Sequence, residues 1–164
     1  MTTAQKRELL RPEEADVAPA QMRQLNKIGA ELGEIAGIKA MTDITGFGLL
    51  GHLAEVCEGS GVQASLHYQQ VPRLAEAARY LQQGAVPGGT VRNFASYGHK
   101  IGPLTDEQKF YLCDPQTSGG LLVCVEPGEA EAAAQAVFAR HGLALESFGE
   151  LRARPEGEPW IVLA

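Results

Sequence analysis

The chain has 164 residues, of which 45% are hydrophobic and 21% are charged, and its formal net charge is −6. This length fits a single domain with one core, and the apolar fraction excludes general disorder. The acidic balance argues against binding to nucleic acid, and no segment has the roughly 20 consecutive apolar residues that cross a membrane. Three cysteines without CxxC spacing, and an N-terminal region without an apolar leader, predict free thiols in the cytoplasm.

The first part of the chain predicts an arm, a helix and a glycine-rich turn that leads into a second helix. Residues 1–15 are polar and broken by a proline, so we expect a linker or loosely docked arm, with the domain itself over 16–164. Apolar residues at steps of three and four predict a helix over 16–35. A short apolar run then leads to TDITGFG at 42–48, after which the apolar positions of 49–57 again have helical spacing.

The rest of the chain predicts four strands and three helices around a long loop. The expected ranges are 62–68, 121–125, 145–151 and 160–163 for the strands, and 73–83, 105–112 and 129–141 for the helices. Residues 84–104 contain five Gly and two Pro, which predicts a long ordered loop. Helices that alternate with a few strands predict an α/β or α+β layered domain with a mixed sheet.

Asp43 is the first candidate for a functional residue. It ends a predicted strand, and Gly46 and Gly48 after it allow backbone N–H groups at a helix N-terminus to approach a phosphate. Because a carboxylate repels a bare phosphate, Asp43 favours a bridging Mg²⁺. The alternative is that Asp43 is only a turn or cap residue.

The segment Asp114–Gly120, DPQTSGG, is the second candidate. Its hydroxyls and open backbone suit an oxyanion, but it has neither the first glycine of a nucleophile elbow nor the lysine of a Walker A loop. A tight turn that enters a strand is the alternative. Just before it, Cys113 has no base nearby in the sequence, so we expect a structural thiol.

Two further features carry weaker signals. No acidic residue occurs between Glu76 and Asp106, whereas Arg79, Arg92 and Lys100 lie there, which indicates either an anion-facing surface or solvated charges on a loop. At the start of a predicted helix, His52 is expected to serve in packing or capping rather than as a metal ligand.

Three motifs together resemble a known family. MTDITGFGLLGHL, GGTVRNFASYG and CDPQTSGGLLV, in this order, are similar to the C-terminal half of the selenophosphate synthetase (selenide, water dikinase) family. The family belongs to the aminoimidazole-ribonucleotide-synthetase-like (AIR synthetase) superfamily, whose members bind ATP between an N-terminal and a C-terminal domain. The resemblance implies an α+β domain with helices on a mixed sheet and a ferredoxin-like element.

The resemblance also implies roles for residues of the three motifs. Asp43 is expected to hold Mg²⁺ bound to ATP. The cleft is expected to be lined by Thr45, Gly46, Gly48, Thr90, Asn93, Thr117, Ser118, Gly119 and Gly120. The implied whole enzyme is a homodimer that makes selenophosphate, AMP and phosphate from ATP, selenide and water.

The family's reactive Cys or selenocysteine, its nearby Lys and most of its metal carboxylates belong to an N-terminal domain that this sequence lacks. We therefore expect a truncated chain without catalytic residues, inactive alone, whose arm joins it to that domain. Two alternatives remain at this stage. In the first, the chain belongs to another ATP-dependent member of the superfamily, of the AIR synthetase or hydrogenase maturation factor type. In the second, it is a stand-alone docking module without catalytic activity.

Overall fold

Five strands form two separate sheets in the computed structural model, which describes residues 1–164. In the first sheet, β1 (Ile38–Asp43) pairs with β3 (Leu121–Val125) in antiparallel orientation. The second sheet has the order β4-β2-β5. Its central strand β2 (Val62–Leu66) is antiparallel to β4 (Gly149–Ala153) and parallel to β5 (Ile161–Leu163).

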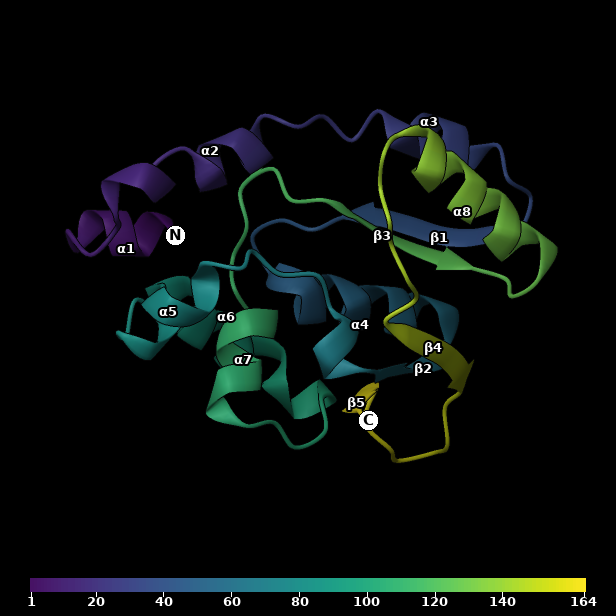
Figure 1. Cartoon of the computed structure of the whole chain (residues 1–164). Helices are drawn as coiled ribbons and strands as arrows, with labels where there is room; N and C mark the ends of the chain where they lie inside the picture. Colours follow the sequence, from purple (N-terminus) through teal and green to yellow (C-terminus); the bar gives the residue numbers. More distant parts are fainter.

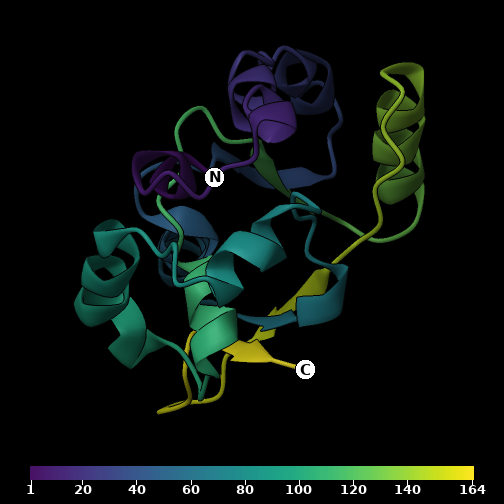
Figure 2. The same ribbon diagram turned by 60° about the vertical axis from the view of Figure 1, so that its left-hand side comes forward.

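Eight helices complete the fold (Figure 1). They are α1 (Thr2–Lys6), α2 (Val17–Met22), α3 (Ile28–Gly33), α4 (Gly48–Ser60), α5 (Ala77–Gln82), α6 (Gly88–Tyr97), α7 (Asp106–Leu112) and α8 (Glu129–Arg140), with short 3-10 turns at Pro12–Glu14, Tyr68–Gln70 and Gly98–Lys100. Helices α3 and α8 pack against each other and against the β1–β3 pair. The three-stranded sheet lies at the opposite end of the molecule from them (Figures 1 and 2). None of these helices combines the length and apolarity needed to cross a membrane.

Helix α4 is the centre of the main core. Most of its residues are buried, because it contacts β1, β2, β5, α6 and α7 on different sides. A helix enclosed in this way is apolar around most of its circumference, and Leu50, Leu53 and Cys57 supply that surface. It ends at Gly61, whose φ of 69° is the left-handed conformation that glycine tolerates best. The loop that precedes α4 is thus attached to the most buried helix.

The predicted loop over 84–104 is wrong, because most of it is helix α6 and a 3-10 turn. Its glycines and prolines lie before the helix, in its first turn and after its end, so they leave the middle of the helix uninterrupted. From there Thr90, Asn93 and Tyr97 lie on one buried face at spacings of three and four. Two of these three side chains are polar and the third is an aromatic with a hydroxyl, so the helix shows no apolar stripe. Tertiary contacts stabilise it instead.

The single helix predicted over 16–35 is also wrong, because the chain forms α2 and α3 with an extended connection between them. Leu25, which fits the helical spacing, is 71% exposed in that connection. Nearby, Asn26 donates a hydrogen bond from Nδ2 to the Gly119 carbonyl at 2.9 Å. A long-range contact of this kind overrides the local periodicity.

The α+β class and the mixed sheet are confirmed, and so are the remaining elements to within a few residues. The capping box of Thr105 and Gln108 forms as expected. The order β1–α4–β2 followed by β3–α8–β4 repeats the strand–helix–strand unit of the expected ferredoxin-like element. However, β2 and β4 pair with each other rather than extending the β1–β3 sheet.

Residues 1–15 pack against α5 and the residues after it. Ala4 is fully buried in a small cluster with Tyr80 and Ala85. Glu14 accepts hydrogen bonds from Arg79 at 2.5 Å and from the Tyr80 hydroxyl. The role of this segment as a linker stays a prediction.

Candidate functional site

The connection between β1 and α4 forms a tight turn with Asp43 at its start. Asp43 is the last residue of β1, opposite Leu121 in β3. At the end of the turn, Gly48 has a φ of 70°, and a Cβ there would lie 2.8 Å from the carbonyl oxygen of Asp114. A side chain at position 48 is therefore excluded by both backbone conformation and space. This close approach joins the turn to the DPQTSGG segment, Asp114–Gly120.

Asn93 of α6 connects the two turns. Its Nδ2 donates hydrogen bonds to the carbonyl oxygens of Gly46 at 2.8 Å and Cys113 at 3.0 Å. The Tyr97 hydroxyl, also on α6, donates to the carbonyl of Phe47 at 2.5 Å. Helix α6, which the sequence did not predict, thus holds the TDITGFG turn against the CDPQTSGG segment.

The turn of the DPQTSGG segment contacts the TDITGFG turn directly. The Gln116 N–H donates to the Thr45 carbonyl at 2.9 Å, and the Ile44 N–H donates to the Gly120 carbonyl at 2.9 Å. A Cβ at Gly119 would collide with the carbonyl oxygen of Ile44. All three motifs of the sequence therefore meet in one place, and their lining of a cleft stays a prediction.

Several backbone N–H groups in these turns donate no hydrogen bond within the protein. They belong to Thr45, Gly46, Phe47, Thr117, Ser118, Gly119 and Gly120. The carbonyls of the same segments accept from Asn93, Tyr97 and neighbouring N–H groups. Unbonded donors next to a helix N-terminus favour an anion.

The side chains of the site differ in exposure. Asp43, Thr117 and Ser118 are exposed, whereas Asn93 is buried in its contacts with the turns. Thr90 is fully buried, and its Oγ1 has no hydrogen-bond partner. A direct contact of Thr90 with a ligand stays a prediction.

The metal-binding capacity of the chain is small. No group of three or more His, Cys, Asp or Glu side chains is arranged to hold a metal ion. Asp43 is exposed and its carboxylate takes part in no ion pair or hydrogen bond. Mg²⁺ bound to a nucleotide needs one or two protein carboxylates beside the phosphate oxygens, so Asp43 fits one position of such a complex and not a complete site.

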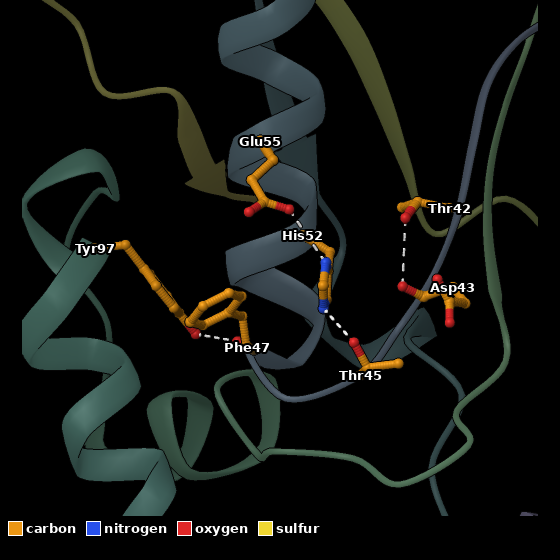
Figure 3. A network of polar contacts seen from close by, with 7 residues as sticks. All are labelled: Thr42, Asp43, Thr45, Phe47, His52, Glu55 and Tyr97. Atoms are coloured by element: carbon orange, nitrogen blue, oxygen red, sulfur yellow. Dashed lines mark hydrogen bonds and ion pairs between the residues drawn. The ribbon is translucent and has the colours of Figure 1, made fainter.

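Asp114 and His52 are polar residues of the site whose environment the sequence did not reveal. Burial raises the pKa of the Asp114 carboxyl to about 6, and the positive charge of the N-terminus offsets this effect only in part. His52 is buried and bonds both Thr45 and Glu55 through its ring nitrogens (Figure 3). Its spacing of three residues from Glu55 was the available signal.

The cysteines of the site region are poor nucleophiles. Cys57 and Cys113 are fully buried, and burial raises the pKa of Cys57 to about 11 and that of Cys113 above its ordinary value. A thiol of this kind stays protonated at neutral pH. The prediction of a structural thiol at Cys113 agrees with this environment.

The stretch between Glu76 and Asp106, which has no acidic residue, does not form a broad cationic surface. Arg79 pairs with Glu14 at 2.5 Å, and Lys100 pairs with Glu58 at 2.7 Å. Carboxylates from distant parts of the sequence neutralise two of the three cations, which the sequence window did not show. Of the three cations in this stretch, only Arg92 takes part in no ion pair.

Comparisons with known proteins agree with the resemblance of the three motifs. Residues 1–161 match the family model of AIR synthase related protein, C-terminal domain. Selenide, water dikinase of Cronobacter sakazakii is 56% identical over 161 residues, which cover 98% of this chain and 46% of that protein. The proteins of the same name from Yersinia pestis and Pseudomonas aeruginosa are 59% and 58% identical over 151 residues, or 92% of this chain and 43% and 44% of theirs. The chain thus spans less than half the length of these relatives.

Proposed function

Since the chain belongs to the family of AIR synthase related proteins, C-terminal domain, we propose that it is the C-terminal part of a selenide, water dikinase. In this proposal it forms one wall of a cleft for Mg·ATP, and the rest of the protein forms the other wall. The whole enzyme makes selenophosphate, AMP and phosphate from ATP, selenide and water.

The unbonded N–H groups of the two turns carry this proposal. Seven donors, from Thr45–Phe47 and Thr117–Gly120, have no acceptor in the protein. Most of these residues are exposed, so a ligand can reach them. Phosphate oxygens are acceptors that match such donors, and the positive end of the α4 dipole adds to the attraction. In this proposal the anion is the triphosphate of ATP.

Asp43 supplies a different part of the same site. Its carboxylate projects from the turn on the side of β1 (Figure 3). When Mg²⁺ is bound, the ion neutralises phosphate charge and orients the transferred group. Asp43 would hold that ion by one oxygen, and the other protein ligands belong to the remaining half of the enzyme. The chain binds and orients the nucleotide, and we assign no catalytic nucleophile to it.

Partners and compartment are part of the proposal. Phe47 and Val91 are large apolar side chains that are 51% and 59% exposed on the turn and on α6. Exposed apolar surface beside a binding site favours contact with another protein surface, here the remaining half of the enzyme. A homodimer of the whole protein is the expected assembly. Three free cysteines favour the reducing cytoplasm.

Replacement of Asp43 by Asn in the protein at the length of its relatives tests the proposal. ATP-dependent turnover is expected to be lost, because the amide cannot replace the charge of a metal ligand. The melting temperature should be unchanged, since the Asp43 carboxylate has no partner in the fold. Asp16→Asn, which removes only a surface pair with Arg23, is the control that keeps activity.

Near-normal turnover of Asp43→Asn contradicts the metal assignment. Calorimetry of the 164-residue chain adds an independent check. One wall with a lone carboxylate is expected to bind Mg·ATP no more tightly than about millimolar. Micromolar binding by this chain would show that the site does not depend on a second wall.

A further inference from the structure

Three polar side chains form a continuous line from the surface of α4 to the first turn. Glu55 Oε2 lies 3.2 Å from His52 Nδ1, and His52 Nε2 lies 3.1 Å from Thr45 Oγ1 (Figure 3). His52 is 9% exposed, so water competes little for its ring nitrogens. The ring also packs against Phe47, with centroids 5.9 Å apart, which restricts its orientation.

The partners of His52 assign its tautomer. An ionised carboxylate only accepts hydrogen bonds, so Nδ1 carries the proton that is donated to Glu55. In the neutral imidazole, Nε2 is then an acceptor, and the Thr45 hydroxyl donates to it. The Thr45 oxygen has no other side-chain bond, so its lone pairs remain free while its hydrogen is engaged.

We propose that His52, held by Glu55, is a positioning residue that fixes Thr45 Oγ1 as an acceptor-only group on the cation side of the nucleotide site. This inference rests on the proposed function. Thr45 then presents two opposite groups, because its backbone N–H is a free donor for phosphate and its side-chain oxygen is a free acceptor. The acceptor lies two residues from the exposed carboxylate of Asp43, and it suits the hydrated divalent cation that a nucleotide carries.

Simpler roles for His52 explain less of the geometry. A helix cap is excluded, because the N-cap residue Phe47 receives no side-chain cap and His52 lies inside the helix. A metal ligand needs a free ring nitrogen, and both ring nitrogens of His52 already bond Thr45 and Glu55. Packing alone does not require an acceptor at Nδ1 and a hydroxyl at Nε2.

The tautomer is measurable on the 164-residue chain by two-bond ¹H–¹⁵N correlation of the histidine rings at neutral pH. His52 is expected to show a protonated Nδ1 and an unprotonated Nε2. Glu55→Ala removes an exposed carboxylate and is expected to shift the ring towards the other tautomer. A ring with Nε2 protonated in the unchanged chain, alone or together with Nδ1, overturns the inference.

Kinetics of the protein at the length of its relatives test the role. Thr45→Val and His52→Gln are each expected to raise the KM for Mg·ATP roughly fivefold to tenfold, the effect of one hydrogen bond. The double variant should be no worse than Thr45→Val alone, because His52 acts through Thr45. Thr45→Ser keeps the hydroxyl and should restore most of the loss, and Glu58→Gln on the same helix is the unaffected control.

Two results separate the inference from the proposed function. Independent, multiplying effects of Thr45→Val and His52→Gln, or a Thr45→Ser variant as weak as Thr45→Val, overturn the positioning role. If Asp43→Asn still abolishes turnover in that case, the proposed function stands without it. If Asp43→Asn is active while the tautomer is as expected, the hydrogen-bond line exists, and it is the assignment of Asp43 to the metal ion that is wrong.

Discussion

Asp114→Asn is expected to stabilise the chain at neutral pH. Asp114 is largely buried after α7 with no hydrogen-bond or ion-pair partner, and burial raises its pKa from 3.8 to about 6. The native state therefore binds more protons than the unfolded state between these pH values, and stability falls as pH rises through that window. At about 1.4 kcal/mol per pKa unit, the penalty at pH 7 is up to about 3 kcal/mol. Asparagine has nearly the same shape and no charge, so it avoids that penalty.

Urea unfolding followed by circular dichroism, for both chains across pH 4 to 7.5, measures this effect. The variant should be more stable by about 2–3 kcal/mol at pH 7, and the difference should shrink towards zero as the pH falls from about 6 to 4. Taking the difference cancels the titration of the other carboxyl groups. Asp16→Asn, at an exposed pair, should show no such gain. A variant that is no more stable at pH 7, or a gain independent of pH, refutes the reasoning.

Two further expectations concern how the turns are held. Asn93→Ala removes two donated hydrogen bonds and leaves the carbonyls of Gly46 and Cys113 unpaired, so the free energy of unfolding should fall by about 2–3 kcal/mol in the same urea assay. Asn93→Asp, which loses the donors but keeps the size, should be at least as harmful, and an unchanged value would contradict the role of α6. Gly48→Ala combines a φ of 70° with a backbone collision and should lower the melting temperature sharply or prevent folding. Gly59→Ala in the same helix has open space around it and should be neutral or slightly stabilising, so equal behaviour of the two would contradict the packing.

Local signals in the sequence were sufficient for much of the fold. The capping box at Thr105 marks the start of α7, and Gly142, with a φ of 71°, follows the end of α8. The apolar run Leu121–Val125 forms β3 as expected. Each of these signals is contained within a few residues, so no knowledge of distant contacts is needed.

The features of the fold that the sequence did not predict depend on contacts between distant parts of the chain. Helix α6 is hidden by glycines at its start and by the polar residues Thr90 and Asn93 on its buried face. The side chain of Asn93 bonds to Gly46, which is 47 residues away. Similarly, the division of the strands into two sheets depends on β2 pairing with β4 across the whole second half of the chain. Sequence periodicity carries no information about such partners.

For the candidate site, motif composition selected three segments that the structure brings together, but it did not show how each side chain is used. The glycines at 46, 48 and 119 were expected to open the backbone to a phosphate, whereas the structure shows that Gly48 and Gly119 lie against the backbone of Asp114 and Ile44. The side chains that hold the turns bond almost entirely to carbonyl oxygens, such as those of Gly46, Phe47 and Gly119. The N–H groups of the same residues have no internal acceptor. In the proposed function, these unsatisfied donors give an anionic partner a binding energy that folding has not already used.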